Sequence, residues 1–193
     1  MATMVLTGSR EASYRGLRMT ADEYLALADD GYRYELIDGV ICMSPSPSRP
    51  HQKIVTEIVR QIADHLMRHP TGEVVVEVDV RLGEDLVYRP DLVYLSSAKA
   101  AGCRERINVV PDLIVEVVSP DSRRYDHETK KHDYERCGVG EYWLIDPDQR
   151  EFTFYRLQDG RFVQVQAAAA TYASEMIPGF ELDLQRLRTL FAA

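Results

Sequence analysis

The chain has 193 residues, of which 45% are hydrophobic and 28% are charged, and its formal net charge is −8 at pH 7. This length and composition are ordinary for a globular protein with one core, and no stretch approaches the roughly 20 apolar residues of a membrane-spanning helix. The acidic balance speaks against nucleic acid as a partner, because proteins that neutralise phosphates usually present a basic surface.

Residues 1–18 are expected to form a disordered tail, and residues 19–193 a single domain. The first residues lack the basic region and apolar core of a secretion signal. The three cysteines, Cys42, Cys103 and Cys137, form no Cys-x-x-Cys pair. Their pattern indicates a reducing compartment and disfavours a structural zinc site. We therefore expect a cytoplasmic protein without a membrane segment.

The first third of the chain predicts a short helix, a hairpin and a longer helix. Thr20 stands three residues before Glu23, which is the pattern of a capping box at a helix start. The dipeptide Asp38-Gly39 interrupts strand-like residues and indicates a tight hairpin turn. After a loop rich in proline and serine, Pro50 opens a helix that carries one apolar stripe.

The rest of the chain predicts strands and helices in succession. Strands are expected at 72–83, 86–95 and 112–118 and three times within 141–166, with helices at 123–137 and near the C-terminus. A polar connection rich in small residues follows the second of these strands. Together the elements predict an α/β (α+β) fold, in which helices flank a mixed β-sheet.

Two of the apolar strands contain a carboxylate. Asp91 lies in "RPDLVYL" and Glu116 in "PDLIVEVVSP", where burying an ionised group costs several kcal/mol unless a cation compensates it. If the two strands are neighbours, both carboxylates can converge near one edge of the sheet. They would repel each other, and Mg²⁺ would relieve the repulsion because it prefers hard oxygen ligands. A bound ion polarises a phosphoryl oxygen and lowers the pKa of an attacking water.

One lysine completes this pattern. At 100° per residue, Lys130 lines up with Tyr134 and Cys137, on the helix face that should pack against the sheet. Lys131 lies on the solvated face with acidic neighbours, where an ordinary ion pair is expected. An ammonium group directed at Asp91 and Glu116 can orient a water molecule or stabilise a pentavalent phosphate.

Six blocks of the sequence resemble, in order, the Uma-two family of restriction endonucleases, which belongs to the PD-(D/E)XK nuclease superfamily. They are "YELIDG", "H" at 51, "VDVRL", "RPDLVYL", "PDLIVEVVSP" and "YDHETKKHDYERCGVGEYWLIDP". The resemblance runs from about Met19 to Leu157. It implies a restriction-endonuclease-like core, a Mg²⁺ or Mn²⁺ cofactor and a DNA substrate.

The resemblance also implies roles for particular residues. Pro90-Asp91 supplies the "PD" of the motif, and Glu116 supplies the acid of its second half. Val118 occupies the place of the expected lysine, which the family pattern moves to Lys130 on the following helix. Glu35, in "YELIDG", matches the acidic residue near the start of the family's fold. The backbone carbonyl of Val117 would be a further metal ligand.

Structural explanations of the same residues remain open. They are a turn cap for Asp91, an arginine partner for Glu116, a snorkelling side chain for Lys130, a cross-strand pair with Arg33 or Arg81 for Glu35, and a backbone-bonded ring at a helix end for His51. His51 could instead act near the scissile phosphate. Asp79 and Arg81, in "VDVRL", are expected to form an ion pair.

The sequence thus favours a metal-dependent endonuclease that hydrolyses DNA phosphodiester bonds. Asp91, Glu116 and the Val117 carbonyl would hold the ion, Glu35 would assist directly or through water, and Lys130 would position or activate the nucleophile. The bound ion and a few arginines would supply local positive potential in spite of the acidic net charge, and a homodimer is a further expectation. The alternative is a nuclease-fold binding module without useful turnover, acting in a defence or mobile-element system. A glycoside hydrolase with two carboxylates explains neither Lys130 nor the lack of an aromatic sugar platform.

Overall fold

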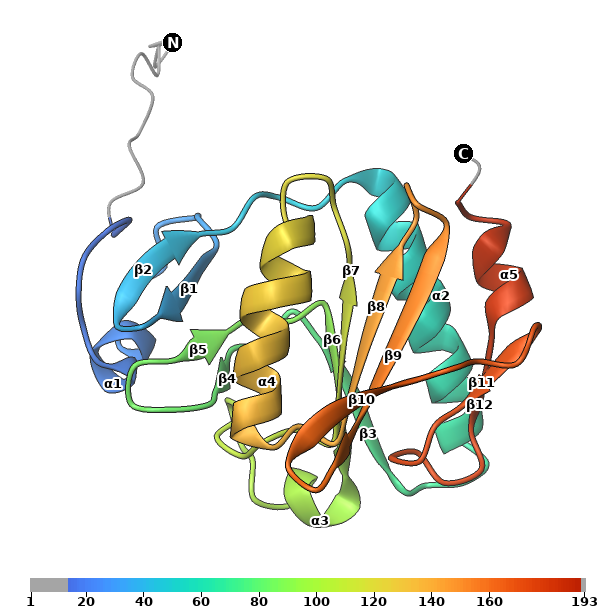
Figure 1. Cartoon of the computed structure of the whole chain (residues 1–193). Coiled ribbons are helices and arrows are strands. Elements are labelled where there is room, and N and C mark those ends of the chain that lie inside the picture. Colours follow the sequence, from blue (N-terminus) through green and yellow to red (C-terminus); the bar gives the residue numbers. More distant parts are fainter. Residues whose placement is uncertain (1–13, 192–193) are drawn as a thin grey trace, which may run out of the picture.

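A computed structural model describes residues 14–191 of the chain (Figure 1). Most of the tail predicted for residues 1–18 lies outside this range. Residues 14–18 contact the hairpin that follows, because the Gly16 N–H donates to the Ile41 carbonyl and the Ile41 N–H to the Leu17 carbonyl (2.8 and 2.9 Å). Within the described range, every helix is too short or too polar to cross a membrane.

The helices agree with the predicted ones, with one addition. They are α1 (Ala21–Leu25), α2 (Arg49–Leu66), α3 (Ser97–Ala100), the π-helix η1 (Tyr125–Lys130), its continuation α4 (Lys131–Cys137) and α5 (Leu184–Arg188). Thr20 and Glu23 form the predicted capping box at the start of α1, and α2 begins with a proline in its first turn. The short helix α3 lies in the stretch predicted as a connection.

The strands form three sheets. The largest has the order β10-β9-β8-β7-β6-β3 and comprises β3 (Gly72–Val76), β6 (Leu92–Ser96), β7 (Leu113–Val117), β8 (Glu141–Asp146), β9 (Glu151–Gln158) and β10 (Arg161–Val165). A smaller sheet has the order β2-β1-β5-β4, with β1 (Tyr34–Ile37), β2 (Val40–Met43), β4 (Val80–Arg81) and β5 (Val87–Tyr88). β11 (Thr171–Ala173) and β12 (Glu181–Asp183) form a two-stranded sheet. β7 and β8 are parallel and the other pairs of the large sheet are antiparallel, so the predicted mixed sheet is confirmed.

Helices cover both faces of the large sheet (Figure 1). The face that contains Val115 and Val117 packs against α2, whereas Ile114 and Val118 pack on the other face with Tyr134 of α4. This alternation follows from the two-residue period of a strand. It directs Glu116, which lies between Val115 and Val117, towards α4.

Two predicted strands are each divided between the two larger sheets. The stretch 72–83 splits into β3 and β4 because the backbone at Glu77 turns into the left-handed region (φ 52°). The stretch 86–95 splits into β5 and β6 around Pro90, which has no N–H to donate to a sheet. Asp91 therefore lies just before β6, in the segment that joins the two sheets.

Candidate active site

Lys130 is surrounded by carboxylates from three elements. Its Nζ lies 2.8 Å from Glu116 Oε1, 3.4 Å from Glu35 Oε1 and 3.7 Å from Asp126 Oδ1. Glu116 comes from β7, Glu35 from β1, and Asp126 from the helical turn before Lys130. All four side chains are buried. Lys130 thus points to the sheet, on the face that helical spacing predicts.

The π-helix places two members of this group side by side. A π-helix is wider than an α-helix and occurs mostly as a single turn within an α-helix, often at a functional site. Over η1 it turns both Asp126 and Lys130 into the interior. Further along, the Tyr134 hydroxyl donates to the same Glu116 Oε1 that binds the lysine (3.1 Å). The neighbouring Lys131 instead lies 4.0 Å from Glu135 on the outer side.

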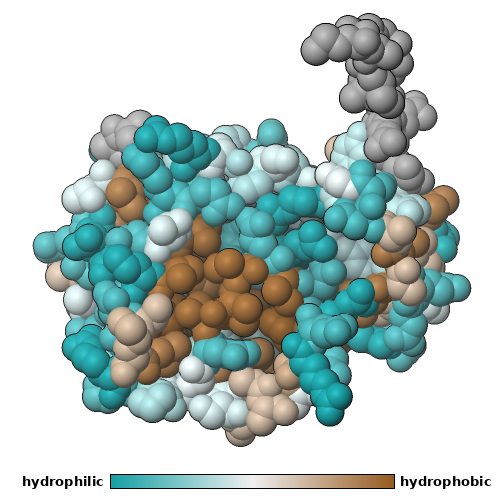
Figure 2. Space-filling view, turned by 180° about the vertical axis from the view of Figure 1, so that it is seen from behind, coloured by the Kyte–Doolittle hydropathy of each residue, from teal (hydrophilic) through white to brown (hydrophobic). Residues whose placement is uncertain are grey.

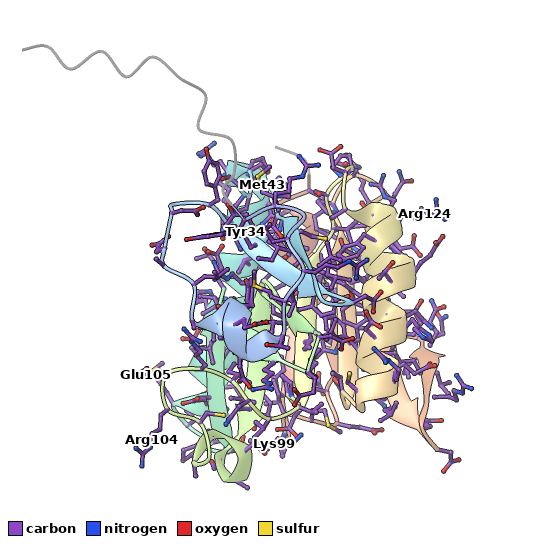
Figure 3. The ribbon with its side chains drawn as sticks, turned by 90° about the vertical axis from the view of Figure 1, so that its left-hand side faces the viewer. Tyr34, Met43, Lys99, Arg104, Glu105 and Arg124 are labelled. Atoms are coloured by element: carbon purple, nitrogen blue, oxygen red, sulfur yellow. The ribbon has the colours of Figure 1, made fainter. Side chains whose placement is uncertain are left out.

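The smaller sheet contributes to the site through its hairpin. Figure 3 looks onto this hairpin, with Tyr34 labelled on it, and shows beside it the helix whose first end is marked by Arg124. Tyr34 and Glu35 are adjacent in β1 and point to opposite faces. Tyr34 packs with α1, and Glu35 reaches Lys130. The two sheets therefore meet at the carboxylate–lysine cluster.

Asp91 and His51 extend the cluster on the α2 side. Asp91 Oδ2 accepts the Val117 N–H at 2.8 Å, which ties Asp91 to the strand that bears Glu116. His51, in the first turn of α2, places its Nε2 3.0 Å from the same oxygen. The other ring nitrogen, Nδ1, is buried and has no hydrogen-bond partner among the described residues.

Burial and crowding of like charges perturb the titration of this site. Burial raises the pKa of Glu116 well above its usual range, and Asp91, Asp126 and Glu35 add to this effect against the opposing ammonium of Lys130. The pKa of Asp126 is raised for the same reasons. Burial alone would lower the pKa of Lys130, but its three carboxylate neighbours outweigh burial and raise it well above normal. The lysine therefore stays protonated.

The ion pairs around Glu35 differ from two sequence expectations. Asp79 pairs with Arg89 (2.8 Å) rather than with Arg81, which binds Asp22 (2.5 Å) and Glu84 (3.2 Å). The expectation of an Asp79–Arg81 pair is wrong because the segment after β5 brings Arg89 to Asp79. The backbone N–H of Arg89 also donates to Glu35 Oε1 (3.2 Å).

Glu35 has neither of the arginine partners that the sequence allowed. Arg33 pairs with Glu77 (3.1 Å), and Arg81 is engaged elsewhere. Glu116 likewise has Lys130 rather than an arginine as its cation.

Sequence reasoning missed Asp126 and the hydroxyl of Tyr134. Asp126 precedes Lys130 by four residues, so the argument that turned the lysine inward also applies to this acid. Tyr134 was recognised as part of the buried stripe, but its hydrogen bond to Glu116 requires the position of the strand. Asp126 lies close to the ammonium group of Lys130, and the Tyr134 hydroxyl donates to the Glu116 carboxylate.

The donor set is compatible with a hard divalent cation. Three buried carboxyl groups, from Glu116, Glu35 and Asp126, lie within 4 Å of the single ammonium group of Lys130, and Asp91 lies beside them on the α2 side, so the cluster holds more acidic groups than cations. Within residues 14–191, no three side chains of His, Cys, Asp or Glu are arranged as a ready-made metal site. Mg²⁺ does not need one, because it often binds one or two carboxylates and completes its shell with water.

Mixed sheets flanked by helices, with this cluster where the two larger sheets meet, define a restriction-endonuclease-like protein. The family model Uma2, described as "Putative restriction endonuclease", matches residues 21–185, and the chain belongs to this family. A crystal structure of "a putative nuclease belonging to DUF820" from Anabaena variabilis has the same fold, with a TM-score of 0.76 and 22% identity over 90% of this chain and 99% of that one.

A second solved structure, the type IIG restriction endonuclease BpuSI, matches at a TM-score of 0.40 and 19% identity, over 77% of this chain and 17% of that one. Comparison with curated protein sequences gave no match.

Proposed function

We propose that the protein is a metal-dependent endonuclease that hydrolyses phosphodiester bonds of DNA. The observation that supports this most strongly is the buried Lys130, held by Glu116, Glu35 and Asp126 beside Asp91. A structural lysine needs one partner, whereas three carboxyl groups share this ammonium, and their crowding helps to raise the pKa values of Glu116 and Asp126. Membership of the Uma2 family supports the same reaction class.

In this proposal Asp91, Glu116 and the carbonyl of Val117 would hold Mg²⁺ or Mn²⁺, with Glu35 assisting directly or through water. The ion, when bound, would polarise the scissile phosphoryl group and lower the pKa of the attacking water. His51 would orient Asp91 through its contact of 3.0 Å. Glu116 and Val117 lie at the end of β7, where the Val117 N–H fixes Asp91.

Lys130 would act as a fixed positive charge rather than as a base. Its raised pKa keeps it protonated at neutral pH, so it can donate hydrogen bonds but cannot accept a proton. Such a donor stabilises the negative charge that develops on a phosphate in the transition state, or orients the water that attacks it. The Tyr134 hydroxyl would hold Glu116 in place while Lys130 stabilises the phosphate or orients the water.

Cleavage of supercoiled plasmid tests this proposal. Purified protein is incubated with plasmid in Mg²⁺, Mn²⁺ or EDTA, alongside a Glu116→Gln variant prepared in the same way. We expect slow nicking that is strongest with Mn²⁺, whose affinity for such sites usually exceeds that of Mg²⁺. We expect none in EDTA and none from the variant. Intact plasmid with every metal, at low and at moderate salt, would contradict the proposal.

A binding module without turnover is the second candidate, and a specific observation favours it. Each carboxylate of the cluster already has a hydrogen-bonding or ionic partner, and the chain carries a net charge of −8. A gel-mobility assay in EDTA separates the candidates. Retarded DNA that is never cut after metal is added would favour the binding module.

A further inference from the structure

β3 is an open edge of the six-stranded sheet. Of the strands that the structure describes, it pairs with β6 alone. Its sequence, Gly-Glu-Val-Val-Val, has high strand propensity and contains neither lysine nor proline. Proteins usually protect an edge strand with lysine or proline, with a bulge or with a covering segment, because an unprotected edge pairs with other chains.

Aliphatic side chains continue from this edge onto the neighbouring helix. Val74 of β3, together with Val59 and Leu66 of α2, lies half-exposed at the border of the core. Val76 is 42% exposed. Figure 2, which views the molecule from behind, shows a broad hydrophobic area on this side of the molecule. A contiguous apolar patch of this kind usually marks an interaction surface.

The opposite edge of the same sheet is blocked. In β10, the outward N–H of Phe162 donates to Glu135 Oε2 of α4 (2.6 Å), and Arg161 pairs with the same carboxylate (3.0 Å). A carboxylate on an edge N–H prevents a further strand from pairing there. The two edges therefore differ, although Val163 of β10 is as exposed as Val76 (42%).

We propose that β3 pairs with β3 of a second copy of this chain, antiparallel and about a two-fold axis. An antiparallel edge is self-complementary, so one surface serves both copies. An axis at Val74 sets Glu73 opposite the partner's Val75 and Gly72 opposite the partner's Val76. In this register no two carboxylates face each other directly.

The same arrangement covers the apolar patch. A two-fold axis normal to the sheet keeps both α2 helices on one face of the joined sheet. The half-exposed Val59 and Leu66 of each copy then flank the paired strands and shield Val74 and Val76 from water. The pairing ends at Glu77, whose left-handed backbone and bonds to Arg33 and Gln52 turn the chain away. A second copy of the chain thus both pairs with the open edge of β3 and covers the apolar patch beside it.

Sedimentation velocity of the full chain, without metal or DNA, tests the surface. The matched variants are Val76→Lys and Val163→Lys, which add the same charge at equally exposed valines on opposite edges. We expect the wild type and Val163→Lys to be dimeric, and Val76→Lys to dimerise about 100-fold more weakly, since an ammonium group buried among the apolar side chains of the interface costs several kcal/mol. Far-UV circular dichroism should show that all three are folded.

A cysteine placed on the axis tests the register. Residues directly opposite in an antiparallel pair have Cα atoms about 4.5–5.5 Å apart, within the range of a disulfide. Mild oxidation should convert Val74→Cys, but neither Val163→Cys nor the wild type, into a dimer that thiols reverse on a denaturing gel. A monomeric wild type, or equal behaviour of the two lysine variants, would overturn the proposed surface. A Val74→Cys variant that stays uncrosslinked would overturn the pairing about Val74. None of these measurements depends on nuclease activity.

Discussion

At the scale of single residues, the charge of Lys130 is set by its neighbours. Its side chain is only 8% exposed, which by itself would favour the neutral amine. Glu116, Glu35 and Asp126 reverse that tendency and raise its pKa. Among the described residues, the Lys130 ammonium is also the only cationic group within 4 Å of each of these three acids. Removing it would leave buried negative charge without compensation, so its loss affects stability as well as chemistry.

We therefore predict two effects of Lys130→Ala. Plasmid nicking should fall by at least about 100-fold, the scale of one preorganised donor. The free energy of unfolding should drop by about 3 kcal/mol, as for one partner removed from a buried ion pair. Activity is measured well below the melting temperature of the variant, so that loss of fold does not imitate loss of catalysis.

Lys131→Ala is the matched control. Its ammonium lies 4.0 Å from Glu135 on the outer side of the helix. The two side chains are partly exposed, and Glu135 keeps its bonds to Arg161 and to the Phe162 N–H without Lys131. The variant should therefore lose no more than about 1 kcal/mol of stability, and nicking should remain close to wild type. If the two alanine variants lost activity equally, the assignment of Lys130 as the transition-state donor would be wrong.

Residue patterns alone predicted that Asp91, Glu116 and Lys130 would converge, and the structure brings them together. Asp91 and Glu116 were conspicuous because carboxylates interrupt apolar strands, and Lys130 because it shares a helix face with Tyr134. Side-chain partners were predicted less well. Asp79 binds Arg89 and not Arg81. This pair could not be predicted because it depends on how the chain folds back after β5 and brings Arg89 to Asp79.

At the scale of elements, the main departures lie where the backbone leaves a regular pattern. Helical spacing indicated one helix over 123–137, and the structure has η1 followed by α4. A π-helical turn contains one residue more than an α-helical turn but uses the same residue types, so the composition of the segment does not predict it. The divided strands follow from the backbone at Glu77 and from Pro90, of which only the proline is visible as a breaker in the sequence.

One ionic contact fixes the start of the helix that carries the site. Arg123, two residues before η1, donates to both oxygens of Asp146 at the end of β8 (2.6 and 3.1 Å). Burial of Asp146 opposes its ionisation, but Arg123 and the N–H groups of Gln149 and Asp148 outweigh burial and lower its pKa. This contact ties the helix to the sheet near Asp126.

We predict that Asp146→Asn lowers the free energy of unfolding by about 1–3 kcal/mol at pH 7, the effect of losing hydrogen bonds to a charged group. A carboxyl whose pKa is depressed by folding stabilises above its unfolded pKa of about 3.9, and the contribution is lost as pH falls through the folded value. The difference between wild type and variant should therefore shrink below about pH 4.

Asp148→Asn is the control for this contact. Asp148 is 53% exposed and lies 3.5 Å from the same arginine, so its replacement should change stability by less than about 0.5 kcal/mol. Urea denaturation at pH 7 and at pH 3.5 measures both variants. A gap for Asp146→Asn that persists unchanged at the lower pH would exclude the ionic origin of its effect.

At the scale of the whole molecule, the site lies where the two larger sheets meet. Glu35 belongs to the smaller sheet, Glu116 to the larger one, and Asp91 to the segment that joins them. The mixed sheet and its flanking helices were predictable from strand and helix periods. The division into two sheets was not, because it depends on which distant strands pair. Cation binding at this junction should therefore stabilise the packing of one sheet against the other.

We predict that Mn²⁺ raises the free energy of unfolding of the wild type by about 2.7 kcal/mol at a hundredfold excess over its Kd, because the ion binds only the folded chain. Asp91→Asn should lose most of this gain. Without metal it should differ from the wild type by no more than about 1 kcal/mol, since the introduced amide oxygen still accepts the Val117 N–H and crowding of negative charge is relieved. Thermal melts with Mn²⁺ and with EDTA measure both quantities.

Asp121→Asn is the appropriate comparison, because Asp121 also follows a proline but is exposed. It should keep the full response to Mn²⁺. A purely structural Asp91 predicts a different pattern: a melting temperature several degrees lower in EDTA, and the same small response to Mn²⁺ in wild type, Asp91→Asn and Asp121→Asn. That pattern would mean that the contacts with Val117 and His51 are the whole role of Asp91. The surplus of acidic groups over cations around Lys130 would then need an explanation other than a divalent cation.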